Sequence, residues 1–403
     1  LVELRSVNFL PLQEVDTNYR SYTSIPSDKV RMLLACALFY NFDLASVIRF
    51  TGGNYTASHL DVDAILRKLK EIGLQDYIFQ HIKRALTIGC PAYFNAESSL
   101  ENFKAFLEYG NHSSITQHIA TVAKTMTKEY RHCYVIPFPR WIARLCPHLH
   151  LTPQGILLKP GKNPRMIWDS YFLPFWWSKN INDLQRQDMS PEIVFGFALL
   201  RHLVRIYNLR ISYPNRDTFI WDDDVAGAYR IPKYNPAVAA AFAFAIMQWL
   251  FLPTSGVFGS KTSPHEYEPF ARARAFLAEH LSRDQTLVMK HANILQAVEI
   301  EVEPKPHQVY FVPTKADSIN KGVFHPGTTI SVNTPHNPFV DDTLMADVID
   351  HILTAMAASI ESLFLLFGFP NETLRRSPLS MEKFTKFKCS WVKEQLGIII
   401  NTR

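Results

Sequence analysis

The sequence predicts an α+β fold in which a helical first third precedes a longer region of mixed strands and helices. In the first third, apolar residues recur at the spacing of an α-helix. From about Cys146 onward, short β-prone runs alternate with clusters of Pro, Gly and Asn. The chain has 403 residues and is 47% hydrophobic, so it holds enough apolar material for a sizeable core.

One capping site and several glycines mark the helices that are expected in the first third. Ser27 and Asp28 are capping residues before the first apolar run, and Gly52, Gly73 and Gly110 interrupt the later pattern. The expected helices cover residues 27–38, 62–72, 77–86, 100–107 and 115–130.

The second region should contain both strands and helices. A helical block at 194–207 leads into a short β-prone run at 218–221, and a long amphipathic helix is expected at 344–367, where Gly368 and Pro370 stop it. The change in pattern places a boundary near residues 133–150. We therefore expect a helical N-terminal extension at 1–140 and a mixed α+β region at 141–403.

Composition excludes several classes of protein. The hydrophobic content excludes a disordered chain, and the five widely spread cysteines, an odd number with no CxxC pair, indicate free thiols in a reducing compartment. The net charge of +5 permits a polyanionic partner without requiring one. The N-terminus lacks the pattern of a signal peptide, and the apolar stretch at 237–252 is too short to span a bilayer. We expect an intracellular protein, in the cytoplasm or nucleus, without a membrane partner.

Two acidic clusters follow short apolar runs. Asp222, Asp223 and Asp224 end the run at 218–221, and Asp341 and Asp342 follow Phe339 and Val340. Side chains alternate along a strand, so Asp341 and Asp342 converge only at a strand end or on a hairpin turn. Converging carboxylates repel one another unless a cation neutralises them, and an all-oxygen site suits Mg²⁺. The simpler alternative is two solvated acidic turns, but the preceding apolar strands favour a site.

These clusters belong to a series of motifs that resembles the reverse transcriptases of retroelements. Phe339-Val340-Asp341-Asp342 is similar to the aromatic-x-Asp-Asp box of that family, and the step from Asp224 to Tyr229 resembles its first palm motif. The other resembling segments are 159–169 (Lys-Pro-Gly-Lys-Asn-Pro-Arg-Met-Ile-Trp-Asp), 248–264 with Leu252-Pro253 and Gly256, and Leu396-Gly397. All occur in the family's order over residues 146–403. The retrotransposon type is the nearest, with the tyrosine-recombinase (DIRS-like) group as the suggested subgroup.

The resemblance implies the fingers and palm of a right-hand polymerase, with an antiparallel palm sheet backed by helices and a helical N-terminal extension. The implied activity is RNA-directed DNA polymerisation by a two-metal mechanism, with an RNA or DNA template, a primer and deoxynucleoside triphosphates as partners. Two Mg²⁺ ions are the implied cofactors, and Mn²⁺ can substitute for them. Thumb, RNase H and integrase segments are not expected in this sequence.

The resemblance also assigns roles to individual residues. Asp224, Asp341 and Asp342 are the implied catalytic metal ligands; alternation alone does not distinguish Asp222 from Asp224, and the distance to Tyr229 selects Asp224. Lys383 is the implied general acid, with Lys386 and Lys388 as alternatives. The implied nucleotide-binding residues are Lys162 (or Lys159), Arg165, Tyr229 beneath the sugar, and Gly256.

Two other functions are consistent with the same motifs. A catalytically inactive, polymerase-like module could bind RNA as a scaffold, although such copies usually lose an active-site Asp and all three are present here. A viral RNA-dependent RNA polymerase usually carries Gly-Asp-Asp and accepts ribose, so Phe339, Val340 and Tyr229 argue against it. Primer extension distinguishes these alternatives from the leading prediction.

Overall fold

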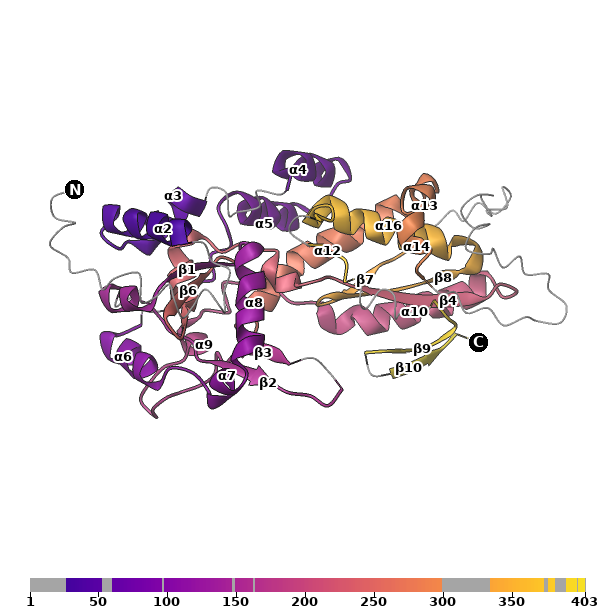
Figure 1. Ribbon diagram of the computed structural model, residues 1–403. Helices are drawn as coiled ribbons and strands as arrows, with labels where there is room; N and C mark the ends of the chain where they lie inside the picture. Colours follow the sequence, from indigo (N-terminus) through magenta and orange to yellow (C-terminus); the bar gives the residue numbers. More distant parts are fainter. Residues whose placement is uncertain are drawn as a thin grey trace. The chain divides into compact units, whose positions relative to one another are not determined.

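A computed structural model describes the chain over residues 27–52, 60–95, 98–146, 149–161, 164–298, 334–372, 376–380, 389–396 and 398–402. Over these ranges helices and antiparallel sheets are combined, as the sequence predicts (Figure 1). The chain forms two compact units, which we call unit 1 and unit 2. Unit 1 comprises Leu1–Ser58, Arg84–Ser190 and Pro232–Glu266, and unit 2 comprises His59–Lys83, Pro191–Ile231 and Tyr267–Arg403.

Both units are built from segments that are separated in the sequence. The expected division at residues 140 and 141 follows a change in the sequence pattern, whereas the two units are defined by compactness. The expected division therefore stays a prediction. The helix α5 (Asp76–Thr87) begins within the segment of unit 2 and ends within a segment of unit 1.

Unit 1 surrounds an antiparallel sheet with the order β1-β6-β5. Its strands are β1 (Val135–Pro139), β5 (Phe244–Ile246) and β6 (Trp249–Pro253), and all their residues are buried. A separate hairpin joins β2 (Gln154–Leu157) to β3 (Arg165–Trp168). Its helices are α2 (Ser27–Phe39), α3 (Leu44–Gly52), α6 (Leu100–Tyr109), α7 (Ser113–Gln117), α8 (Ile119–Arg131), η2 (Arg140–Leu145), α9 (Ile181–Leu184), α11 (Pro236–Ala239) and η5 (Ala240–Phe242).

The expected helices of the first third form close to their expected positions, and capping residues stabilise their ends. The side chain of Ser99 accepts a hydrogen bond from the Asn102 backbone at the start of α6, and Gly110 ends this helix at φ 77°. The expected helix at 115–130 is instead divided into α7 and α8 at His118, whose φ of −122° is not helical.

Unit 2 is organised around a three-stranded antiparallel sheet with the order β4-β8-β7. The strands are β4 (Thr218–Asp224), β7 (Asn337–Phe339) and β8 (Asp342–Val348), and a second hairpin pairs β9 (Val392–Gln395) with β10 (Ile398–Asn401). The helices are α4 (Val62–Glu71), η3 (Phe195–Phe197), α10 (Ala198–Ser212), η4 (Ala228–Arg230), α13 (Thr286–Lys290), α14 (Ala292–Leu295), α16 (Ile349–Phe367) and, from Tyr267 onward, α12 (Ser263–Leu281).

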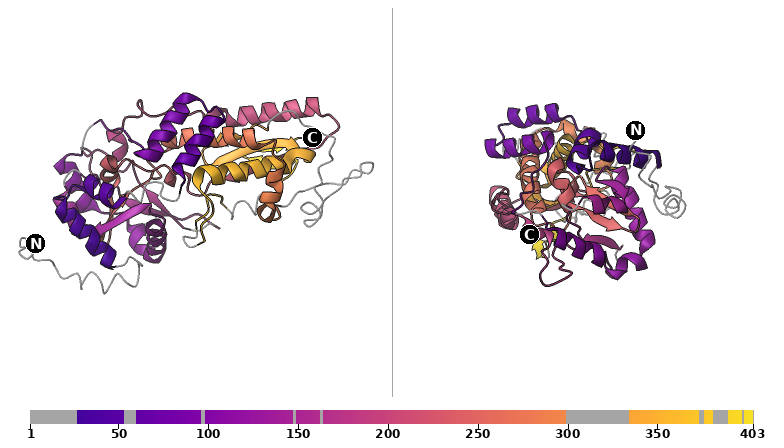
Figure 2. Two further views of the ribbon diagram at one scale, coloured as in Figure 1. Left: turned by 90° about the horizontal axis from the view of Figure 1, so that it is seen from above. Right: turned by 90° about the vertical axis from the view of Figure 1, so that its left-hand side faces the viewer.

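Helices cover both faces of the β4-β8-β7 sheet (Figure 1). On one face, Ile206 and Leu209 of α10 pack against Ile220 of β4 and Ala346 of β8. On the other face lie α12 and α16, which carry the polar contacts described below; Figure 2 shows α16 and α10 in a second view. Strand β4 is therefore buried along its whole length.

Two expected helices of unit 2 have different boundaries in the structure. The helix expected from Leu344 begins at Ile349, since residues 342–348 form β8 and pair with β4. A short apolar run fits a strand or a helix equally well, and here the pairing partner decides. The helix expected at 194–207 lies four residues later, as α10, and is preceded by the short 3₁₀ turn η3.

By length and composition, α16 could cross a membrane. However, 78% of its most apolar window is buried inside the protein. That environment is the one expected for a helix of the hydrophobic core.

Candidate metal centre

The hairpin between β7 and β8 carries two carboxylates at its tip. Phe339 pairs with Asp342, so Val340 and Asp341 form a two-residue turn. Val340 has a φ of 57°, the sign that a type II′ turn requires at this position. A β-branched residue rarely adopts this conformation, so the turn is locally strained. The result is that Asp341 and Asp342 lie at a strand end, where neighbouring carboxylates can converge.

Strand β4 brings a third carboxylate to the same place. Asp224 is the last residue of β4 and lies opposite Asp342 in the antiparallel register. One carboxylate oxygen from each of Asp224, Asp341 and Asp342 lies within 4.8 Å of the other two. Asp224 is buried, whereas Asp341 and Asp342 are half-buried. The three side chains form an all-oxygen cluster that is partly exposed to solvent.

Backbone hydrogen bonds fix the cluster. The N–H of Val225 donates to the carbonyl of Asp341 at 2.9 Å, which ties the hairpin turn to the residue after Asp224. The carbonyl of Asp224 accepts from the N–H of Ser380 at 3.0 Å. These bonds hold the carboxylates close together through the backbone, despite their mutual repulsion.

The two preceding acidic residues of β4 have other partners. Asp222 pairs with Lys393 of β9. Burial raises the pKa of Asp222, and this effect outweighs the opposing effect of Lys393. Asp223 points to the opposite face of the sheet, because side chains alternate along a strand. Only Asp224 of the three joins Asp341 and Asp342.

Asp223 belongs to a buried polar network beneath the cluster. The side chain of Arg274 is fully buried on α12 and donates hydrogen bonds to Asp223, to Thr343 of β8 at 2.8 Å and to Ser359 of α16 at 2.8 Å. The hydroxyl of Ser359 also donates to Asp223 at 2.6 Å. This network joins two helices to the two strands that carry the carboxylates.

Arg274 is not among the predicted site residues, although the sequence carries a signal for it. Tyr267, Phe270 and Ala271 are buried at helical spacing, and Arg274 occupies the next position of that apolar stripe. A cation in such a position needs a buried anion as its partner.

Tyr229 lies close to the carboxylates, in the turn η4 that follows Gly227. Gly227 has a φ of 68°, and this left-handed residue turns the chain back after β4. Burial, with a smaller contribution from the charge of Asp341, raises the pKa of Tyr229 to about 12. Its hydroxyl is therefore protonated at neutral pH, and its ring lies 6.0 Å from that of Tyr267, in an edge-to-face arrangement.

The remaining predicted site residues belong to unit 1 or lie outside the described residues. Arg165 is an exposed residue at the start of β3 in unit 1, and Gly256 is a buried residue of the same unit. Lys159 is exposed in the β2–β3 hairpin. Lys162 and Lys383, like the alternatives Lys386 and Lys388, lie outside the described residues.

Comparisons with known proteins find matches among solved structures alone. No protein-family model and no curated protein matches the chain. A crystal structure of the prototype foamy virus protease–reverse transcriptase (CSH mutant) has a TM-score of 0.42 and 12% identity, over 97% of this chain and 35% of that chain.

Two foamy viral complexes give similar values. The protease–reverse transcriptase dRH bound to double-stranded DNA has a TM-score of 0.38 and 13% identity, over 84% of this chain and 46% of that chain. The complex with an RNA/DNA hybrid has a TM-score of 0.40 and 11% identity, over 84% of this chain and 35% of that chain. This chain thus spans less than half of the length of these three proteins. At such TM-scores, the functional assignment rests on the geometry of the acidic cluster.

Proposed function

We propose that this protein is an RNA-directed DNA polymerase of the retrotransposon type, which extends a primer on an RNA or DNA template. The observation that carries the proposal is the convergence of Asp224, Asp341 and Asp342, whose oxygens lie within 4.8 Å of one another at the ends of two paired strands. The order of the surrounding motifs in the sequence supports the same activity.

The carboxylate cluster fits a hard divalent cation. Three anionic oxygens this close together repel one another, and the half-buried positions of Asp341 and Asp342 leave room for further oxygen ligands from a substrate. We assign two Mg²⁺ ions to the cluster, with Mn²⁺ able to replace them. When bound, such ions lower the pKa of an attacking hydroxyl and stabilise the leaving pyrophosphate.

The other residues bind and orient the nucleotide. The ring of Tyr229 supports the sugar, and Arg165 provides a planar fork for phosphate oxygens. In the same proposal, Lys162 adds a point charge, Gly256 allows a close approach of the backbone, and Lys383 donates a proton to the pyrophosphate as it leaves.

All five cysteines are free thiols, which supports an intracellular location in the cytoplasm or nucleus.

The test is Mg²⁺-dependent primer extension by three variants, Asp224→Asn, Asp341→Asn and Asp342→Asn. Each keeps the shape of the side chain and removes its charge, so we expect the folded protein to lose extension by about 10²-fold or more. Asp350→Asn is the matched control, because Asp350 lies in the same unit, pairs with Arg216 at 3.0 Å and is outside the cluster.

Different results would identify the alternatives. Normal extension by Asp341→Asn would contradict the site assignment. A wild-type protein that binds primer–template but never extends it would be an RNA-binding module, and one that prefers ribonucleotides would be an RNA polymerase.

A further inference from the structure

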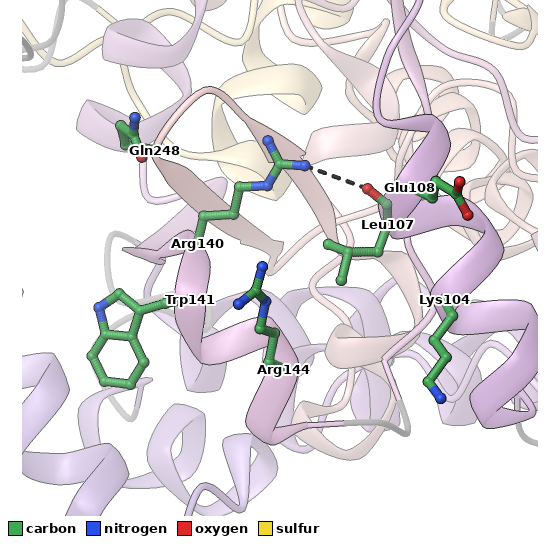
Figure 3. A pocket seen from close by; sticks show the side chains of 7 residues that line it. All are labelled: Lys104, Leu107, Glu108, Arg140, Trp141, Arg144 and Gln248. Carbon is green, nitrogen blue, oxygen red and sulfur yellow. Dashed lines mark hydrogen bonds between the residues drawn. The ribbon is translucent and has the colours of Figure 1, made fainter. Parts of the chain in front are cut away.

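A basic cavity in unit 1 is lined by residues to which no individual role is assigned above. It has a volume of about 460 Å³ and is formed by α6, η2 and the turn between β5 and β6 (Figure 3). Its lining residues are Lys104, Leu107, Glu108, Arg140, Trp141, Arg144 and Gln248. This volume lies within the range of small-molecule and nucleotide sites.

One of the cations in the cavity has a structural role. The guanidinium of Arg140 donates to the carbonyl of Leu107 at 3.5 Å and to that of Met247 at 3.3 Å. Its backbone N–H donates to the carbonyl of Gln248 at 2.7 Å. Leu107 is in the last turn of α6, where carbonyls lack partners within the helix, so Arg140 joins this helix end to the β5–β6 turn.

The other two cations are available to a ligand. Within the part of the chain that the structure describes, Lys104 and Arg144 are exposed and form neither an ion pair nor a hydrogen bond through their side chains. Glu108 is the one acidic residue in the lining, so three cations and one carboxylate leave a net charge of +2. The cavity therefore favours an anion.

An exposed aromatic ring accompanies these charges. Trp141 follows Arg140 on η2 and is 36% exposed. Figure 3 shows the Arg144 guanidinium lying, in that view, between the Trp141 side chain and Leu107. An indole face in the lining of a cavity that also carries two unpaired cations can stack on a flat base while the cations contact phosphates.

We propose that this cavity binds single-stranded nucleic acid, with a base stacked on Trp141 and the adjoining phosphates held by Arg144 and Lys104. An acidic peptide would use only the positive charges of Lys104 and Arg144, whereas a nucleic acid would also use the ring of Trp141 for stacking. The ring therefore favours a nucleic acid. The proposal goes beyond the polymerase site, because none of the lining residues belongs to the carboxylate cluster and binding requires no nucleotide transfer.

The test measures binding of a fluorescent, single-stranded oligonucleotide of thymidines by anisotropy. Base stacking contributes about 1–3 kcal/mol, so Trp141→Ala should weaken binding by roughly 5- to 150-fold, while Trp141→Phe retains most of the affinity. Arg144→Gln should weaken binding and reduce the slope of log K against log salt by about 0.7, the value for one phosphate contact on a single strand. Glu108→Gln should strengthen binding, because it removes a charge that repels phosphate.

Controls come from the same unit. Trp176→Ala removes a tryptophan that is 91% exposed, and Lys124→Gln removes an exposed cation of α8; both should bind as the wild type does. The catalytic variant Asp341→Asn should also bind normally, which separates this proposal from the proposed function.

Three results would overturn the proposal. One is unchanged affinity in Trp141→Ala. Another is weaker binding in Glu108→Gln. The third is equal competition by an oligonucleotide and by poly-glutamate, which would identify an acidic peptide site.

Discussion

At the scale of single residues, three consecutive aspartates of β4 have three different environments. Asp222 pairs with Lys393, Asp223 with the buried Arg274, and Asp224 joins the carboxylate cluster. The alternation of a strand separates Asp223 from its neighbours, and the end of the strand separates Asp224 from Asp222. A run of identical residues thus supplies both a structural anchor and a candidate metal ligand.

Tyr229 leads to a prediction about sugar selection. If its ring lies beneath the incoming sugar, it excludes a 2′-hydroxyl by steric overlap. Tyr229→Ala should then incorporate ribonucleotides more efficiently relative to deoxynucleotides, by about tenfold or more, and Tyr229→Val should show a smaller effect. Single-nucleotide extension on an RNA template, compared for the two nucleotide types, measures the ratio.

Tyr229→Phe is the control for this prediction. The hydroxyl of Tyr229 is protonated at neutral pH, since its pKa is raised to about 12, so the exclusion should depend on the ring alone. The phenylalanine variant should discriminate like the wild type. If Tyr229→Ala extends with deoxynucleotides and still discriminates as sharply, Tyr229 is a packing residue only.

At the scale of elements, a buried ion pair holds the helices to the β4-β8-β7 sheet. Arg274 of α12 contacts β4, β8 and α16 through one guanidinium. Because the pair is buried, removal of either Arg274 or Asp223 leaves the other as an uncompensated charge in the core.

Arg274→Met should therefore destabilise unit 2 by about 3–5 kcal/mol, because Asp223 would remain buried without its partner. Urea unfolding followed by circular dichroism measures the change. The double variant Arg274→Met, Asp223→Asn should recover part of the loss. Arg201→Met on the exposed side of α10 is the control, with a change of about 0.5 kcal/mol or less. An Arg274→Met variant as stable as the control would show that the pair is dispensable.

The elements also show how far the sequence was informative. Helices with clear caps, such as α4 and α6, formed within two residues of the expected positions, and the convergence of Asp341 and Asp342 on a turn was anticipated from strand geometry. The sequence predicts the start of a helix where the structure has β8, because Leu344, Met345 and Ala346 fit the pattern of a helix and that of a strand. Its assignment depends on pairing with β4, more than one hundred residues earlier, which no local pattern contains.

At the scale of the whole molecule, stability should depend on pH through Glu268, a fully buried residue of α12. Burial raises the pKa of Glu268 to about 7 from 4.5, although the Val194 backbone donates a hydrogen bond to it. The folded state thus holds this proton more tightly than the unfolded state. The stability from Glu268 is complete below pH 4.5 and is lost as pH rises to about 7.

Glu268→Gln isolates this effect, because the amide stays neutral and its oxygen can accept the same bond from Val194. The variant should resemble the wild type near pH 4.5 and melt at a higher temperature above pH 7. The quantity to follow is the difference in melting temperature between the variant and the wild type at each pH. Burial lowers the pKa values of His202 and His336 to about 4. These two histidines make the stability rise with pH, and they do so equally in the wild type and in the variant. A difference that does not grow with pH would contradict the prediction.

The division into two units was not predictable from the sequence. Composition changes only once, near residues 133–150, whereas the chain passes from one unit to the other after residues 58, 83, 190, 231 and 266. Compact units arise from long-range packing, which leaves no local signal at the crossing points. For the site, every assigned role stays a prediction, and Lys162 and Lys383 also lie outside the described residues.

The separated segments of unit 2 also affect its synthesis on the ribosome. Unit 1 has all of its segments once residue 266 has emerged, whereas β4 emerges by residue 224 and its partner β8 only at residues 342–348. Throughout the intervening translation, the edge of β4 that will pair with β8 lacks its partner, and Asp223 lacks the contact with Ser359. Unpaired strand edges of this kind favour aggregation of a nascent chain. The strand that ends in Asp224 is therefore a segment that needs shielding during translation.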